Sequence, residues 1–151
     1  MKQENQDRLN KIISLILLFL WCLLIFGFSN QNGDVSQSTS DSILILLNNI
    51  FNFLGIKIDL LNLSIMSIII RKLAHMFLYF ILFIISNYVS RSYNIKKRYL
   101  YSLLFCLLYA TSDEIHQLFI NERSFGIRDI IIDFIGSLIG LLLIKLRERK
   151  I

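Results

Sequence analysis

The 151-residue chain contains no proline, only two cysteines, two histidines and six glycines. Cys22 and Cys106 each lie in the middle of an apolar run, and their spacing predicts neither a disulfide nor a zinc site. We expect both thiols to act as small apolar side chains. Because so few histidine and cysteine ligands are present, no metal site is predicted. The sequence leaves any cofactor unidentified, and it contains no internal repeat or low-complexity tract.

Apolar residues make up 55% of the chain, and the mean hydropathy is +0.61. They gather in runs that are too long and dense for a soluble core. Lipid cannot hydrogen-bond an open backbone, and the alternation of a transmembrane barrel is absent, so each run is expected to be a helix. The length fits one domain, residues 1–151. We therefore predict an all-α, four-span transmembrane helical bundle with spans at residues 12–28, 73–90, 99–119 and 130–144.

The segment between the first two spans, residues 29–70, is expected to lie on the outer side of the membrane. It opens with a polar, turn-rich stretch, after which Asp41 and Ser42 are suited to cap a helix. Three asparagines at positions 48, 49 and 52 form a narrow polar stripe on the otherwise apolar helix that follows, and Gly55 ends it. The pattern predicts an outer-side amphipathic helix between spans one and two.

The formal net charge is +5, and its distribution indicates a topology. Eleven of the 16 basic residues flank the four runs on one side, at positions 2, 8, 11, 91, 96–98, 145, 147, 149 and 150. The positive-inside rule then predicts a cell-membrane protein with both termini in the cytoplasm, and the charge needs no nucleic-acid partner to explain it. The first run is longer than a signal-peptide core and no small-x-small motif follows it, so we expect a retained anchor.

Charges interrupt the third span before its uncharged stretch is long enough to cross the membrane. The uncharged stretch from Tyr99 to Ser112 reaches only about 21 Å as a helix, against a hydrocarbon core of about 30 Å. Asp113, Glu114 and His116 follow directly. Ionisable groups at this depth are costly and are by default candidates for a functional site.

Ionisable groups on three spans fall at one depth. Measured from the basic residue at the cytoplasmic end of each span, His75 lies at about 24 Å and Asp113 at about 22 Å. On the fourth span, Asp129 and Asp133 lie at about 24 and 18 Å. We expect such groups to face the interior of the bundle and to meet one another.

This polar layer supplies the candidate residues. The catalytic candidates are His75, Asp113, Glu114, His116 and Asp133. The binding candidates are Arg71, Lys72, Tyr79, Gln117, Arg123, Arg128 and Asp129. Gly136 and Gly140 form a Gly-x-x-x-Gly spacing and are assigned to helix packing. The alternative that the charged residues only form structural ion pairs stays open.

Several spaced motifs in the chain resemble one family. They are Lys72-x-x-His75-x-x-x-Tyr79, Asp113-Glu114-x-x-Gln117, Arg123, and Asp129-x-x-x-Asp133-x-x-Gly136-x-x-x-Gly140. Together they resemble the VanZ-like membrane proteins over nearly the whole chain. The chain has Asn121-Glu122 where that family commonly has Pro-Gly, and Asp133 where it often has asparagine. The resemblance implies a four-span integral membrane protein, linked in some members to teicoplanin resistance, and it implies no reaction.

Three functions are compatible with these features. In the first, an outward-facing polar cavity binds a glycopeptide antibiotic or a lipid-linked cell-wall intermediate through the basic residues. In the second, a membrane-embedded hydrolase or transferase acts on a lipid-phosphate substrate, with His75 or His116 as base or nucleophile. A proton-coupled transporter is the weakest hypothesis, because four short spans without an inverted repeat are unlike that class. The lipid bilayer is the expected partner in each case, and the oligomeric state stays open.

Overall fold

The structure, a computed structural model, describes residues 2–55 and 63–149. Within these residues the chain forms helices and no strands, so the all-α prediction is confirmed. The helices are α1 (Lys2–Ser29), α2 (Gly33–Phe53), α3 (Leu63–Ser92), α4 (Arg98–Gln117) and α5 (Ile127–Glu148).

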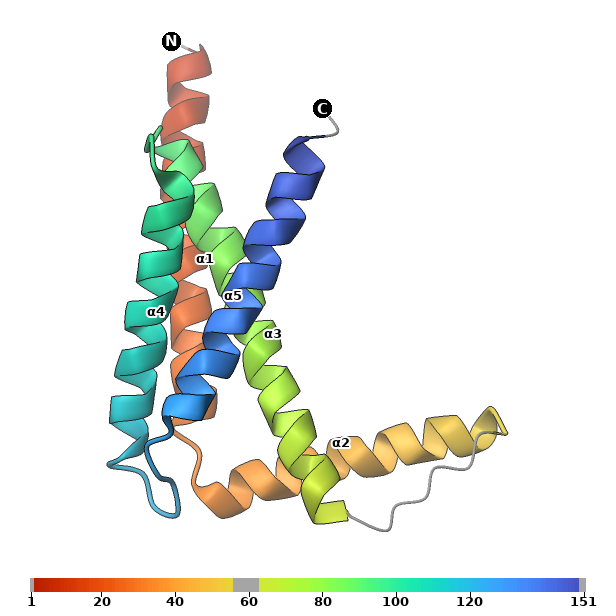
Figure 1. The fold of residues 1–151 in the computed structure, drawn as a ribbon. Coiled ribbons are helices and arrows are strands. Elements are labelled where there is room, and N and C mark those ends of the chain that lie inside the picture. Colours follow the sequence, from red (N-terminus) through yellow and green to blue (C-terminus); the bar gives the residue numbers. More distant parts are fainter. Residues whose placement is uncertain (1, 56–62, 150–151) are drawn as a thin grey trace.

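Four of the helices form a bundle, and the fifth crosses its end. α1, α3, α4 and α5 run along the bundle, while α2 extends sideways at the end opposite both termini (Figure 1). α3 packs against each of the other four helices, most extensively against α5. The turn between α4 and α5 lies at the same end of the bundle as α2 (Figure 1). That end therefore brings together segments that are far apart in the sequence.

The core lies where α1, α3, α4 and α5 meet. Its fully buried members are Ile25, Tyr79, Leu82, Phe83, Cys106 and Ala110. Two long-range hydrogen bonds attach α1 to this core: Trp21 Nε1 donates to Leu78 O (3.0 Å), and Tyr109 Oη donates to Cys22 O (2.6 Å). Both thiols are free. These two hydrogen bonds to backbone carbonyls on α1 and α3 fix the position of α1 along the bundle axis.

Polar side chains are buried while large apolar side chains are exposed. Serines on α1, α4 and α5 are fully buried, namely Ser14, Ser102 and Ser137. Phe19, Leu108 and Leu142, on the same three helices, are more than half exposed. Within the described residues, two helical segments, Gln3–Ser29 and Ile65–Ser92, are long and apolar enough to cross a membrane by length and composition. The other two predicted spans lie on α4 and α5, which carry the charges.

The expected start of the second helix is wrong. The sequence predicts a helix after Asp41, but α2 already begins at Gly33. Tertiary contacts explain the difference: the Gly33 N–H donates to Asn121 O (3.3 Å), and the Asp34 N–H donates to Glu122 Oε2 (3.2 Å). These contacts satisfy backbone donors that the first turn of a helix leaves free. The end near Gly55, which has a φ of +78°, is as expected.

α3 and α5 approach each other closely at two glycines. A Cβ placed on Gly136 would lie 2.1 Å from Met76 O, and one on Gly140 would lie 3.0 Å from Phe80 O. Only a residue without a side chain allows the two backbones this separation. The glycines also bring the N-terminal half of α5, with Asp133, against the middle of α3.

At the end of the bundle that holds the termini, α4 is joined to α5. Arg98 Nη2 lies 2.6 Å from Glu148 Oε2, and Tyr99 Oη donates to the same carboxylate. The hydrogen bond from Tyr99 and the nearby guanidinium lower the pKa of Glu148 below its ordinary value. The contact therefore stabilises the fold when the pH is above the ordinary carboxyl range, and it is lost as the pH falls through the lowered pKa.

Glu148→Gln is accordingly expected to lower the midpoint of thermal unfolding at pH 7 and to have almost no effect at pH 3. Because the pair is partly exposed, the loss at pH 7 should stay below about 1 kcal/mol. Thermal unfolding of the detergent-solubilised protein at both pH values measures this difference. Glu4→Gln, in the exposed first turn of α1, is the control. Equal effects of the two substitutions at pH 7 would contradict the assignment.

Candidate functional site

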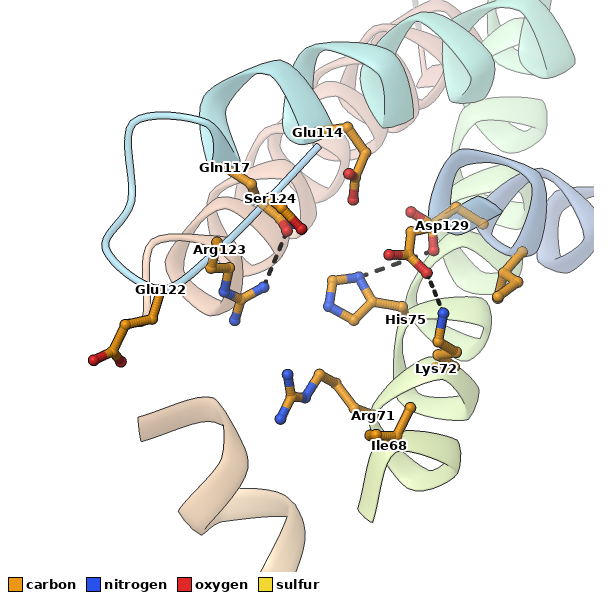
Figure 2. A pocket seen from close by; sticks show the side chains of 12 residues that line it. Ile68, Arg71, Lys72, His75, Glu114, Gln117, Glu122, Arg123, Ser124 and Asp129 are labelled. Carbon is orange, nitrogen blue, oxygen red and sulfur yellow. Dashed lines mark hydrogen bonds and ion pairs between the residues drawn. The ribbon is translucent and has the colours of Figure 1, made fainter. Parts of the chain in front are cut away.

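A polar cavity of about 170 Å³ lies at the end of the bundle where α2 crosses it. α3, α4, α5 and the α4–α5 turn supply its walls. The lining residues are Ile68, Arg71, Lys72, His75, Glu114, Gln117, Glu122, Arg123, Ser124, Asp129, Ile132 and Asp133. Figure 2 shows the side chains of Arg71, His75 and Arg123 directed into the same space. The cavity therefore contains many of the ionisable residues that the sequence analysis placed at one depth.

Arg123 is held in the cavity wall by one helix, α4, and by the loop between α1 and α2. Its Nε donates to Gln31 O (3.0 Å), and its Nη1 donates to Gln117 Oε1 (3.2 Å). Gln117 in turn donates to Ser29 Oγ (3.1 Å) and to Asp113 Oδ2 (3.3 Å). Gln117, at the last turn of α4, therefore connects the end of α1 with the α4–α5 turn. This network fixes the direction of the Arg123 guanidinium.

Arg71 presents a second guanidinium to the same cavity. Its Nη2 donates to Gln37 Oε1 on α2, while Nε is buried. Burial and the positive charge of Arg71 lower the pKa of Arg123. Within the part of the chain that the structure describes, Arg71 Nε and Arg123 Nη2 have no hydrogen-bond partner. Both arginines therefore line one cavity, and each has a buried N–H that no other group in the described residues satisfies.

Three of the four cavity carboxylates are already engaged by donors. Lys72 Nζ lies 2.6 Å from Asp129 Oδ1. Glu114 Oε2 accepts from the Gly126 N–H (2.9 Å), at the residue before α5 begins. Glu122 Oε2 accepts from the N–H of Asp34. These carboxylates hold helices and the α4–α5 turn in place, and none of them hydrogen-bonds to the free donors of the two arginines.

Asp133 is the exception among the cavity carboxylates. It is 1% exposed, and neither of its carboxylate oxygens has a hydrogen-bond partner among residues 2–55 and 63–149. His75 Nδ1 lies 3.9 Å from Asp133 Oδ1, too far for a hydrogen bond. The cavity therefore contains unpaired acceptors as well as unpaired donors. It could hold a ligand that has an anionic group and, beside it, a hydroxyl or amine donor.

Four of the candidate residues lie outside this cavity. Tyr79 is fully buried in the core below it, and Asp113 acts through Gln117. His116 turns toward α1, where its ring lies 4.7 Å from that of Phe26 and its Nε2 lies 3.3 Å from Asn30 Oδ1. Arg128 is exposed. The remaining catalytic and binding candidates line the cavity; their roles stay predictions.

Some cavity residues were not predicted from the sequence. Glu122 and Ser124 lie in the α4–α5 turn, and Gln37 binds Arg71 from α2. Glu122 has a φ of +62°, a conformation that favours glycine. The resemblance noted from the sequence implies a glycine at this position. That glycine was the sequence signal for a turn with a positive φ, whereas nothing near Gln37 marks it as a site residue.

Within the described residues, no group of three or more His, Cys, Asp or Glu side chains could hold a metal ion. The cavity does contain an acid and an imidazole close together, next to two guanidinium groups. Such a set can bind an anion and can exchange a proton with a bound hydroxyl or water.

Comparisons with known proteins agree with the motif resemblance. The model of the VanZ/LLP1 family matches residues 14–148, which is most of the chain. Comparisons with curated proteins and with solved structures gave no significant match. The matched residues include all those that line the cavity. They also include Gly136 and Gly140, the two glycines of α5 that pack against α3. The chain therefore belongs to the VanZ/LLP1 family.

Proposed function

We propose that this chain is a four-span protein of the cell membrane whose outward-facing cavity binds the anionic head of an amphiphile. The ligand class is a lipid-linked cell-wall intermediate or a lipid-bearing glycopeptide antibiotic such as teicoplanin. Binding either one would lower susceptibility to such an antibiotic. The observation that carries the proposal is the pair of half-buried arginines that line one cavity, Arg71 and Arg123, each with a buried N–H that has no partner among the described residues.

The distribution of side chains supports the membrane topology. Apolar side chains cover the outside of α1, α4 and α5, while serines and carboxylates lie inside, as expected when the surroundings are lipid. Both termini lie at one end of the bundle (Figure 1), and the basic residues cluster near that end of each helix. The positive-inside rule makes that end cytoplasmic, so the cavity at the opposite end opens outward.

The chemistry of the cavity supports an anionic ligand. A phosphate or carboxylate presents several acceptor oxygens, and guanidinium groups bind such oxygens with charge-assisted hydrogen bonds. Arg71 is held by Gln37, and Arg123 is held by Gln31 and Gln117, so both are already oriented before a ligand arrives. Orientation in advance reduces the entropy lost on binding.

The test measures binding by the full-length protein in nanodiscs. Affinities are compared for polyprenyl phosphate, for the neutral polyprenol and for teicoplanin. Arg71→Gln and Arg123→Gln should each weaken phosphate binding about 10- to 100-fold, the effect of one charged hydrogen bond. Arg128→Gln, which removes an exposed arginine outside the cavity, should leave the affinity unchanged. Equal affinity for polyprenol and its phosphate, or equal effects of all three substitutions, would refute the proposal.

A second candidate function follows from His75 and Asp133. The two groups lie 3.9 Å apart beside the arginines, an arrangement that suits a hydrolase or transferase of lipid phosphates. Mass spectrometry of the polyprenyl phosphate recovered from the binding assay separates the two functions. Unchanged ligand supports binding alone, whereas release of inorganic phosphate supports the enzyme.

A further inference from the structure

A second cavity, of about 230 Å³, adjoins the polar one on the side of α2. The end of α1, one face of α2 and one face of α3 enclose it. Its apolar walls are formed by Phe28, Ile43, Ile70, Ala74, Phe77 and Leu78. We call this space the α2–α3 groove.

The α2–α3 groove and the polar cavity share two residues, Arg71 and His75. They stand four positions apart on α3 and therefore lie on one face of that helix, one turn from each other. Arg71 binds Gln37 of α2, so the guanidinium stands at the junction between the two spaces. Arg123 lines the polar cavity and not the groove, whereas Phe77 lines the groove and not the polar cavity.

Two of the hydroxyl side chains in the groove wall, Thr39 and Ser40, are bonded within α2. Thr39 Oγ1 donates to Val35 O (2.9 Å), and Ser40 Oγ donates to Ser36 O (2.9 Å). Because these hydroxyls are bonded to the backbone of their own helix, α2 presents mainly their carbon atoms to the groove. The groove offers a ligand contact area and few hydrogen bonds, which suits a hydrocarbon chain.

We infer that the α2–α3 groove holds the first part of the hydrocarbon chain of the same amphiphile whose anionic head lies between Arg71 and Arg123. This inference rests on the proposed function. It gives a structural reason for the ligand to be an amphiphile and not a free anion. The two cavities meet at Arg71 and His75, which line both, and the other residues that line the groove carry no charge. α2 thereby acts as the outer wall of a lipid site.

The experiment uses a monoalkyl phosphate with a photoreactive diazirine near the middle of its chain, and the full chain in nanodiscs. After irradiation, the labelled residues are identified by mass spectrometry. Labelling should concentrate on Ile43, Phe77 and Leu78, and excess unlabelled monoalkyl phosphate should suppress it. The corresponding diazirine alcohol, which lacks the phosphate, should give no such concentrated labelling.

A matched pair of substitutions on α2 tests the groove itself. Ile43→Trp places a larger side chain in the groove, whereas Ile45→Trp makes the same change at an exposed position outside it. Ile43→Trp should reduce suppressible labelling at Phe77 and Leu78 at least fivefold and leave the affinity for a two-carbon alkyl phosphate unchanged. Ile45→Trp should alter neither.

The outcomes separate this inference from the proposed function. Phosphate-dependent labelling that is spread evenly over exposed apolar residues, unchanged by Ile43→Trp, would overturn the groove assignment and leave the arginine site standing. Absence of any phosphate-dependent labelling, together with no affinity for the two-carbon phosphate, would overturn both.

Discussion

Gly136→Ala is expected to destabilise the bundle by roughly 3 kcal/mol or more, the upper part of the range for overpacking. The added Cβ would lie 2.1 Å from the backbone oxygen of Met76, and a backbone atom cannot move aside as a side-chain end can. α5 would have to shift away from α3, its most extensive partner. Reversible unfolding in mixed micelles of dodecylmaltoside and dodecyl sulfate measures the loss.

Gly27→Ala is the matched control for this substitution. Gly27 also lies in a helix, but a Cβ there would have nothing within 4 Å. Alanine has the higher helix propensity by about 1 kcal/mol, so this variant should be as stable as the parent or slightly more so. Gly140→Ala should fall between the two, because its closest contacts would be at 3.0 Å. Equal stability of the Gly136 and Gly27 variants would show that α3 and α5 are not packed as described.

Gln117→Met should both destabilise the protein and weaken binding to the cavity. The side chain keeps its length but loses its bonds to Ser29, Asp113 and Arg123. Each partner loses one hydrogen bond, although Ser29 and Asp113 keep their bond to each other and Arg123 keeps its bond to Gln31. The loss should cost roughly 2 to 4 kcal/mol, with the charged Arg123 contributing most. Affinity for polyprenyl phosphate should fall as well, because Arg123 loses one of its two supports.

Gln6→Met provides the control, since Gln6 makes one exposed hydrogen bond to Asn10 within α1. It should change neither stability nor affinity measurably. The two readouts have different meanings. A stability loss at Gln117 with unchanged affinity would show that Arg123 orients itself without Gln117, which contradicts the network described for the cavity.

The helical architecture and the family could both be recognised from the sequence, because long apolar runs and spaced polar motifs are local patterns. The start of α2 could not, because it depends on the backbone of Asn121 and the side chain of Glu122, which are distant in the chain. Local capping rules identify a residue that can begin a helix. They cannot detect a partner that arrives from another part of the fold.

Depth counting placed several site residues at one level but could not determine their direction. His116 and Gln117 are neighbours on α4, yet Gln117 lines the cavity and His116 faces Phe26. Rotation of a helix about its axis is set by its packing partners, and these are not visible in one sequence. Arg128 is outside the cavity for the same reason, whereas Asp129, the next residue, lines it.

The central position of α3 has a consequence for the order in which the protein is made. α3 leaves the ribosome before α4 and α5, so it exists for a time without the helix that it contacts most. During that interval the backbone of Met76 is uncovered, and the acidic wall that Asp133 supplies has not been synthesised. The cavity is therefore incomplete until α5 has been made, and a nascent chain that stalls before α5 carries two guanidinium groups with no finished site around them.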